Sequence, residues 1–351
     1  MPISVMLKPS SSACNLKCEY CFYASLSEHR DEAFKGIMTA HTAENVIKSA
    51  LSYADGTDVY FTFQGGEPLL SGMDFFENFL ALVEQYNTKG SKITNCIQTN
   101  GTLINEQWCE FFSRNNILVG VSLDGDRELN SHRMYKDGTP SFDDVVHGIE
   151  LLKKYKVSFN ILSVLTSELA QNFKRSYRFF KSLDLHYLQY IPCLSEFGDP
   201  SSPFSMSCDD YAYYLTNGYK LYYNEIMRGV PLSVRQFDNY RLLLRGRPAE
   251  QCGMNGFCSE QFVVEGDGSV YPCDFYCTND YYLGNINDTN FSQLKKSDIY
   301  TSFIKSSFVH DEKCKTCSYL SLCRGGGCKR NRVDFDYCAA YKKFFSEIIS
   351  F

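Results

Sequence analysis

The sequence contains no apolar run that approaches the ~18 residues of a membrane-spanning helix. Its first residues, 1–8, lack the charged and apolar regions of a secretion signal. It carries 35 Lys+Arg against 41 Asp+Glu, a formal net charge of −6, without a basic stripe. We therefore expect a cytoplasmic protein that does not bind nucleic acid through phosphate contacts and does not enter a membrane.

The composition is that of a globular protein. Apolar residues make up 44% of the 351 residues, too many for a disordered or fibrous chain. Short β-like runs alternate with helical segments in the first half, which predicts βαβ units and a parallel sheet. The runs are 3–7, 59–63, 93–98, 118–123, 157–165 and 187–191, and the helical segments are 43–53, 75–86, 106–113, 142–155 and 172–183. Six such units form an incomplete (β/α) barrel, and an open doubly wound sheet is the alternative. Both architectures place chemistry at the carboxyl ends of the strands.

Sixteen cysteines are too few for a disulfide scaffold, but they are clustered. Without a secretion signal, we expect such clusters to bind metal rather than to form disulfides. Cys14, Cys18 and Cys21 follow the first β-like run in a C-x₃-C-x₂-C spacing. Structural zinc sites need four ligands, and this cluster supplies three. An iron–sulfur cubane with one open iron accounts for the missing ligand better.

Nine further cysteines lie in the Gly-rich last hundred residues, where metal would hold the short elements together. Eight of them are enough for two fully ligated four-iron clusters, and two zinc sites are the alternative. The ninth, Cys277, is an unassigned thiol four residues after Cys273.

The first cluster, Tyr20 before its last cysteine and the loop at 64–68 resemble the radical S-adenosylmethionine (SAM) enzymes. The resemblance implies a partial (β/α)6 barrel in which SAM chelates the open iron and yields a 5′-deoxyadenosyl radical. Gly65, Gly66, Glu67 and Pro68 then form the methionine-binding turn, whose paired glycines allow close backbone approach. The resemblance also implies further SAM contacts from Tyr20, Ser122, Asp124 and Arg133.

The C-terminal cysteines resemble the SPASM extension of this superfamily, which carries two auxiliary clusters. The resemblance assigns Cys252, Cys258, Cys273 and Cys328 to the first cluster and Cys314, Cys317, Cys323 and Cys338 to the second. The run from Arg324 to Cys328 is one glycine longer than the usual spacing, so Cys277 is an alternative to Cys328 as a ligand. We expect a radical SAM barrel over 1–192, a connecting and substrate-binding helical region over 193–249 and a SPASM domain over 250–351.

Within this superfamily the sequence resembles the anaerobic sulfatase-maturating enzymes. The matching runs are 9–23, 63–68, 98–103, 252–258 and 261–275. Members oxidise a Cys or Ser of an unfolded sulfatase, in a C/S-x-P/A-x-R motif, to Cα-formylglycine. The resemblance implies SAM, three 4Fe–4S clusters and a reductant such as flavodoxin or ferredoxin.

The resemblance also implies roles for individual residues. Asp274, directly after a cluster ligand, is the expected base that removes the target's thiol or hydroxyl proton. Its alternative role is hydrogen bonding around the cluster. The expected contacts to the substrate peptide are Tyr23, Gln64, Arg235 and Asp238.

Two other functions fit parts of the pattern. A SPASM enzyme that crosslinks a ribosomally made peptide often carries an N-terminal leader-binding domain, and the start of the cluster motif at Cys14 leads us to expect none here. A non-catalytic electron carrier needs the cysteines but not the Gly-Gly-Glu-Pro loop.

Overall fold

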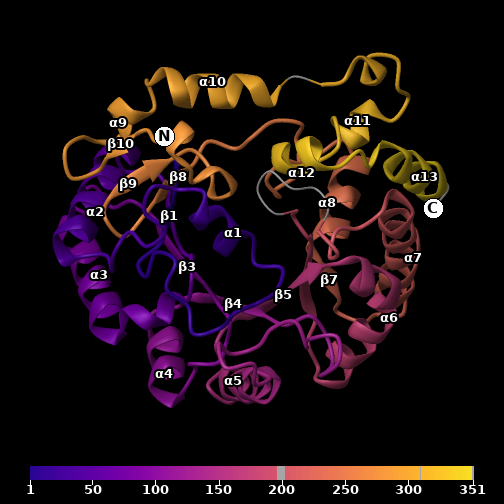
Figure 1. The fold of residues 1–351 in the computed structure, drawn as a ribbon, viewed down its shortest axis with the longest axis horizontal. Helices are drawn as coiled ribbons and strands as arrows, with labels where there is room; N and C mark the ends of the chain where they lie inside the picture. Colours follow the sequence, from indigo (N-terminus) through magenta and orange to yellow (C-terminus); the bar gives the residue numbers. More distant parts are fainter. Residues whose placement is uncertain (196–201, 309, 350–351) are drawn as a thin grey trace. The chain divides into compact units, whose positions relative to one another are not determined.

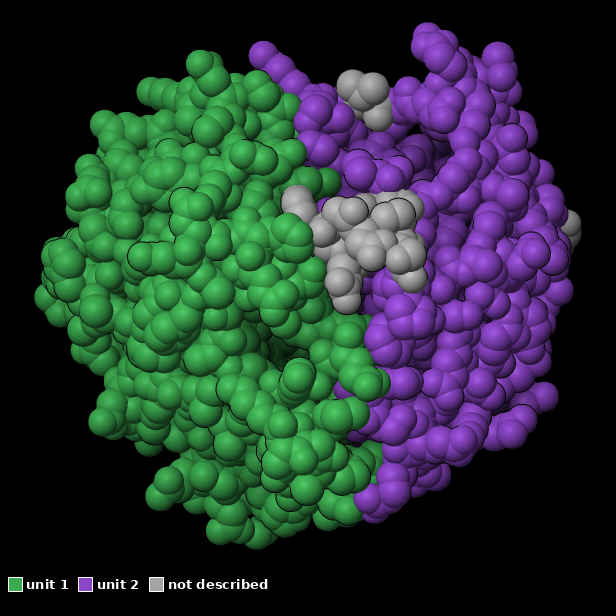
Figure 2. Space-filling model, in the orientation of Figure 1, with its two compact units in different colours: residues 1–122, 133–159, 260–303 green, residues 123–132, 160–259, 304–351 purple. Residues whose placement is uncertain are grey.

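The computed structural model describes residues 1–195, 202–308 and 310–349. The chain divides into two compact units built from interleaved segments, which Figure 2 shows in different colours. Unit 1 comprises residues 1–122, 133–159 and 260–303, and unit 2 comprises residues 123–132, 160–259 and 304–351. The domain boundaries expected at residues 192 and 249 remain a prediction.

Unit 1 contains the first four β/α repeats (Figure 1). Its strands are β1 (Ile3–Leu7), β2 (Val59–Phe63), β3 (Ile93–Thr99) and β4 (Leu118–Ser122), and its helices are α1 (Phe22–Glu28), α2 (Ala40–Ala54), α3 (Met73–Tyr86), α4 (Glu106–Arg114) and α5 (Phe142–Lys154). A short 3₁₀ helix, η1 (Pro68–Ser71), follows β2. The strands pair in parallel, with Ile3 opposite Val59, Val59 opposite Ile93 and Cys96 opposite Leu118. The predicted parallel βαβ arrangement is therefore confirmed.

A segment from far along the chain extends the same sheet. β8 (Phe262–Val264) pairs in parallel with β1, and β9 (Ser269–Tyr271) and β10 (Gly284–Asn285) continue the sheet antiparallel, so the order in unit 1 is β10-β9-β8-β1-β2-β3-β4. The remaining elements are the 3₁₀ helices η2 (Asp274–Tyr276) and η3 (Asn279–Tyr281) and the helices α9 (Phe291–Leu294) and α10 (Asp298–Ser307), the last of which continues into unit 2. The sequence did not predict that β8 would join β1.

Unit 2 contains the parallel strands β5 (Phe159–Leu165), β6 (Tyr187–Pro192) and β7 (Ser233–Val234). Its helices are α6 (Ser167–Ser182), α7 (Cys208–Met227), α8 (Arg235–Leu244), α11 (Leu320–Cys323), α12 (Lys329–Asp334) and α13 (Cys338–Ile348), with the 3₁₀ helix η4 (Glu312–Cys314). α7 packs against α13 through tyrosine and phenylalanine rings, such as Tyr219 and Phe344. Short elements predominate after residue 250, but α10 and α13 are longer than the sequence led us to expect.

The core of unit 1 contains a group of aromatic side chains beneath β2. The Phe63 ring lies 5.0 Å from the Phe76 ring and 4.9 Å from the Phe79 ring, centroid to centroid. Phe79 is fully buried and also contacts Phe61 edge-on. These contacts fix the position of β2, whose carboxyl end carries the Gly-Gly-Glu-Pro loop. Among the described residues, no helix is long and apolar enough to cross a membrane.

We predict that Phe79→Ala lowers the free energy of unfolding by about 3–5 kcal/mol, because it leaves a cavity among these rings. Phe34 is half-exposed in the same unit, so Phe34→Ala is the matched control and should change stability by less than about 0.5 kcal/mol. Denaturant unfolding of the two variants makes the comparison. Equal effects would contradict this account of the core.

Candidate functional site

Three loops at the carboxyl ends of β1, β2 and β3 form one hydrogen-bonded group. The β1 loop carries Cys14, Cys18 and Cys21, all partly buried. Burial raises the pKa of the free Cys14 thiol to about 11, and the nearby Glu67 and Cys21 contribute to the rise. Because the thiolate is the form that ligates metal, binding of a metal cluster here would release this proton.

The Gly-Gly-Glu-Pro loop lies directly against this cysteine loop. The Gly66 N–H donates to the Ser11 carbonyl at 2.8 Å, and the Glu67 N–H donates to the Ala13 carbonyl at 2.8 Å. A Cβ on Gly66 would lie 1.9 Å from the Ala13 carbonyl oxygen. No other residue allows so close an approach, which explains the glycine beside the cluster loop.

Glu67 joins the β2 loop to the β3 loop. Its fully buried carboxylate accepts hydrogen bonds from the Thr99 hydroxyl (2.8 Å), the Leu69 N–H (3.0 Å) and the Asn100 N–H (2.8 Å). Burial raises the pKa of Glu67 to about 7, although these hydrogen bonds act in the opposite direction. Asn100 in turn donates to the Asn15 side chain at 2.8 Å. Glu67, through its carboxylate and its N–H, and Asn100 therefore link the three loops to one another.

Asp274, at the start of η2, reaches the ends of β1 and β2. Its Oδ2 accepts a hydrogen bond from Gln64 Nε2 at 2.9 Å, and its Oδ1 lies 2.5 Å from Lys8 Nζ. Lys8 is fully buried. Burial alone lowers the pKa of Lys8, but Asp274, Cys277 and Glu265 together raise it above its ordinary value. Sequence reasoning selected Asp274 and Gln64, which the structure brings together, and missed Lys8.

Tyr23, on α1, belongs to the same buried group. Its ring lies under the Lys8 ammonium, 3.6 Å from Nζ to the ring centroid, and its hydroxyl donates to Glu265 Oε1 at 2.5 Å. Arg30 forms an ion pair with Glu265 at 2.6 Å. Burial and the Glu265 carboxylate raise the pKa of Tyr23 well above its ordinary value. Glu265 and Arg30 were also missed; the only signal was a carboxylate directly after the apolar run 262–264.

The other residues expected to contact SAM lie in both units. In unit 1, Ser122 accepts a hydrogen bond from Gln98 Nε2 at 3.2 Å, and the Arg133 guanidinium lies 5.3 Å from the Tyr20 ring centroid. In unit 2, the buried Asp124 carboxylate accepts from the Val164 N–H at 2.8 Å, which anchors it to β5.

The two residues expected to contact the peptide from unit 2 lie on α8. The Asp238 carboxylate accepts hydrogen bonds from the hydroxyls of Tyr222 and Ser233. These contacts hold the start of α8 in place. Arg235 extends to Gln189 on β6, with 3.3 Å between Nη1 and Oε1.

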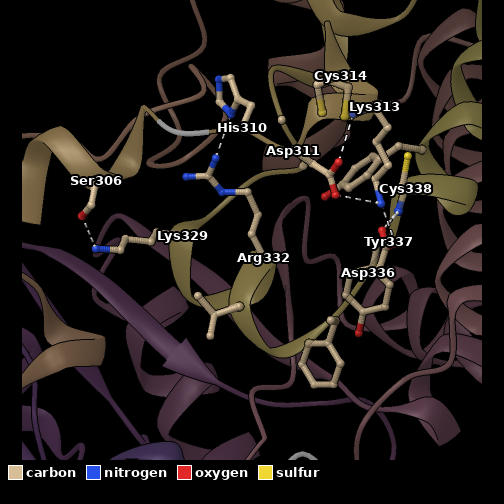
Figure 3. Close-up of a pocket in the computed structure, with 16 residues that line it drawn as sticks. Ser306, His310, Asp311, Lys313, Cys314, Lys329, Arg332, Asp336, Tyr337 and Cys338 are labelled. Atoms are coloured by element: carbon tan, nitrogen blue, oxygen red, sulfur yellow. Dashed lines mark hydrogen bonds and ion pairs between the residues drawn. The ribbon is translucent and has the colours of Figure 1, made fainter. Parts of the chain in front are cut away.

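Four cysteines of unit 2 line one cavity. They are Cys314, Cys317, Cys323 and Cys338. Burial raises the pKa of Cys323 to about 12, and the neighbouring Cys338 and Cys314 raise it further. An adjoining cavity of about 400 Å³ includes three of these thiols, and Figure 3 shows Cys314 and Cys338 there with the Lys313–Asp336 ion pair. The assignment of these four cysteines to one cluster agrees with their positions.

Three cysteines of the other predicted set also lie together in unit 2. Burial raises the pKa of Cys328 to about 11, and the thiols of Cys252 and Cys258 contribute. The added glycine does not displace Cys328, because Gly325, Gly326 and Gly327 all take a positive φ, between 85° and 93°. This turn places Cys328 against Gly253. If Gly253 were replaced by a residue with a side chain, its Cβ would lie 2.7 Å from the Cys328 backbone. The fourth member, Cys273, lies in unit 1, directly before η2.

Cys277 has different surroundings. It is fully buried in unit 1, where burial raises its pKa well above the ordinary value and the charged groups around it are Lys8, Glu265, Asp274 and Arg30. Within unit 2, the thiol near Cys252 and Cys258 is that of Cys328. Among the described residues, no group of three His, Cys, Asp or Glu side chains has the arrangement needed to hold a single metal ion.

Comparisons with known proteins agree with these arrangements. Residues 9–180 match the model of the radical SAM superfamily, and residues 252–318 match that of an iron–sulfur cluster-binding domain. The chain is 45% identical to the cysteine-type anaerobic sulfatase-maturating enzyme of Clostridium perfringens (strain 13 / Type A), over 98% of this chain and 95% of that one. The chain belongs to the family of anaerobic sulfatase-maturating enzymes.

More distant and structural relatives extend this result. The serine-type anaerobic sulfatase-maturating enzyme of Bacteroides thetaiotaomicron is 32% identical, over 99% of this chain and 89% of that one. The solved structure of native anSMEcpe with bound AdoMet and Cp18Cys peptide is similar with a TM-score of 0.92 and 42% identity, over 100% of this chain and 97% of that one. This anaerobic sulfatase-maturating enzyme is thus a radical SAM enzyme, and its fold is the partial α/β barrel of that superfamily followed by a SPASM domain. The predicted barrel is confirmed over the doubly wound alternative.

The raised pKa of Glu67 predicts a pH-dependent stability. The folded protein keeps this proton up to about pH 7, whereas the unfolded chain loses it near its ordinary pKa of 4.5. The free energy of unfolding should therefore fall as pH rises through this interval, because the unfolded state then binds fewer protons. Glu67→Gln should remove that part of the pH dependence, which unfolding at several pH values between 4.5 and 8 measures. If the free energy of unfolding of the variant depended on pH in the same way as that of the wild type, Glu67 would already be ionised in the folded protein.

Proposed function

We propose that this enzyme oxidises a cysteine residue of an unfolded sulfatase to Cα-formylglycine. The observation that carries the proposal is the position of Asp274, held between Gln64 and Lys8 at the strand ends that also carry the three-cysteine loop and the glycine turn. The Asp274 carboxylate and the three-cysteine loop thus lie at the same edge of one sheet, which supports their roles as proton acceptor and cluster site. Family membership supplies the reaction class to which this pair of features belongs.

The residues present fit the groups that the family implies. Cys14, Cys18 and Cys21 would hold a four-iron cluster with one open iron, and Gly65–Pro68 would hold the methionine part of SAM beside it. Two auxiliary clusters would use Cys252, Cys258, Cys273 and Cys328 and Cys314, Cys317, Cys323 and Cys338. When bound, these groups would supply radical chemistry for hydrogen abstraction at the target Cβ and an acceptor for one further electron.

The chain's own residues then position the peptide and move a proton. Asp274 accepts the thiol proton as the carbon–sulfur double bond forms, and hydrolysis by one water then gives the aldehyde and releases the sulfur as hydrogen sulfide. Gln64 keeps the Asp274 carboxylate at the end of β2. We assign peptide contacts to Tyr23, Gln64, Arg235 and Asp238, and SAM contacts to Tyr20, Ser122, Asp124 and Arg133.

Cysteine is favoured over serine as the target. The cysteine-type relatives are 41–45% identical to this chain, whereas the serine-type relatives are 30–32% identical. The similar solved structure of native anSMEcpe holds the Cp18Cys peptide. We infer that the partner is an unfolded sulfatase segment of the form C/S-x-P/A-x-R, with C preferred, and that the reductant is a flavodoxin or ferredoxin.

We predict that Asp274→Asn retains cleavage of SAM to 5′-deoxyadenosine but lowers formylglycine formation by about 10²–10⁴-fold, the usual contribution of a general base. Mass spectrometry of a C-x-P-x-R peptide and chromatography of 5′-deoxyadenosine measure the two products together. Asp267→Asn, in the same unit and paired with Lys35, is the control and should retain both activities. Unchanged peptide oxidation by Asp274→Asn would remove the residue from this role. A product lighter by two hydrogens, in place of the aldehyde, would identify a crosslinking enzyme instead.

Metal content provides a separate test of the cluster assignment. Anaerobically reconstituted protein should contain about twelve irons per chain, and the triple variant Cys14→Ala, Cys18→Ala, Cys21→Ala about eight. The triple variant should also lose SAM cleavage completely. Iron near four in the wild-type protein, or stoichiometric zinc, would contradict three four-iron clusters.

A further inference from the structure

Lys8 is a buried cation in a place where a strand would ordinarily end in an apolar side chain. It directly follows β1, and its side chain is 0% exposed. Removing an ammonium from water is unfavourable by several kcal/mol unless the protein compensates its charge. The compensation comes from Asp274 at 2.5 Å and from the Tyr23 ring at 3.6 Å.

Lys8 contacts two side chains that lie on different elements of unit 1, Asp274 and Tyr23. Asp274 belongs to the segment after β9, and Tyr23 belongs to α1. Tyr23 is fixed at its hydroxyl by Glu265, which Arg30 neutralises. Asp274 is fixed at its other oxygen by Gln64. Lys8 thus contacts both the proposed base and the Tyr23 ring.

The two oxygens of the Asp274 carboxylate are held by different side chains. The Lys8 ammonium lies 2.5 Å from Oδ1, and Gln64 Nε2 donates a hydrogen bond to Oδ2 at 2.9 Å. Lys8 supplies the counter-charge of the carboxylate, and Gln64 is uncharged. Removal of Lys8 therefore leaves one polar contact to the carboxylate but no paired cation.

We infer that Lys8 is a positioning residue, which holds the Asp274 carboxylate in the arrangement that couples radical formation to peptide oxidation. This inference rests on the function proposed above. Without Lys8, the buried carboxylate lacks a counter-charge and moves toward other donors, so SAM cleavage continues while the peptide product is lost.

The test compares Lys8→Met with Lys35→Met. Methionine keeps an unbranched chain and removes the charge. Lys35 also pairs with an aspartate of the segment after β8, Asp267 at 3.2 Å, and its side chain is 14% exposed, so Lys35→Met is a matched control. Both products are measured with the full-length, reconstituted enzyme and a C-x-P-x-R peptide. Lys8→Met should lower formylglycine by about tenfold or more, within the range of a misplaced general base, while 5′-deoxyadenosine stays within about twofold of the wild type. Lys35→Met should change neither.

The double variant Lys8→Met, Asp274→Asn keeps the inference falsifiable if Lys8→Met does not fold, because it removes both charges of the pair together. Since Lys8 acts through Asp274, the double variant should form no less formylglycine than Asp274→Asn alone. A further multiplicative loss would overturn the inference, as would a parallel fall of both products in folded Lys8→Met. If the wild-type enzyme itself forms no formylglycine, the proposed function fails, and this outcome is distinct from failure of the Lys8 inference.

Discussion

The parallel pairing of β8 with β1 is the contact on which the site in unit 1 depends. Three residues of β8, Phe262–Val264, align with Val5–Leu7, and the Lys8 N–H donates to the Val264 carbonyl at 2.8 Å. This short ladder brings Glu265 and Asp274 to the carboxyl ends of β1 and β2. A segment more than 250 residues away in the chain thereby supplies the acidic groups for the loops of the barrel. Without this pairing, the ion pairs of Lys8 with Asp274 and of Arg30 with Glu265 would not form. The Tyr23 hydroxyl would also lose its acceptor, Glu265.

The buried charges are balanced within the described part of unit 1. In the network around Lys8, the cations are Lys8 and Arg30 and the anions are Asp274 and Glu265, whereas the buried Glu67 and Arg133 lie outside these ion pairs. Well-packed apolar residues of similar volume often stabilise a protein as well as a buried ion pair does, or better. Stability therefore does not explain the network. Its position beside the Gly-Gly-Glu-Pro and cysteine loops supports the proposal that it serves the reaction.

Local sequence patterns predicted the repeating part of the fold closely. Runs rich in Val, Ile and Phe placed β1 and β2 at their observed bounds, because such buried parallel strands are recognisable without tertiary information. The helices α2 and α6 begin earlier than predicted, since their first turns are polar and are fixed by the caps Thr39 and Thr166. The cysteine spacing indicated the cluster ligands, and the three left-handed glycines that bring Cys328 to Cys252 became clear only from the backbone. Lys8 was missed because a lysine ordinarily indicates the surface, and its burial arises from the long-range addition of β8.

The central claim is that three cysteines near the amino end hold an iron–sulfur cluster whose open iron binds SAM. Electron–nuclear double resonance of the reduced enzyme, with SAM labelled with ¹⁵N at its amino group, measures this contact directly. The account predicts a hyperfine coupling between the label and the cluster that disappears when Cys14, Cys18 and Cys21 are replaced by Ala. A cluster signal that SAM leaves unchanged, or one that shows a fourth protein ligand on the iron, would contradict it.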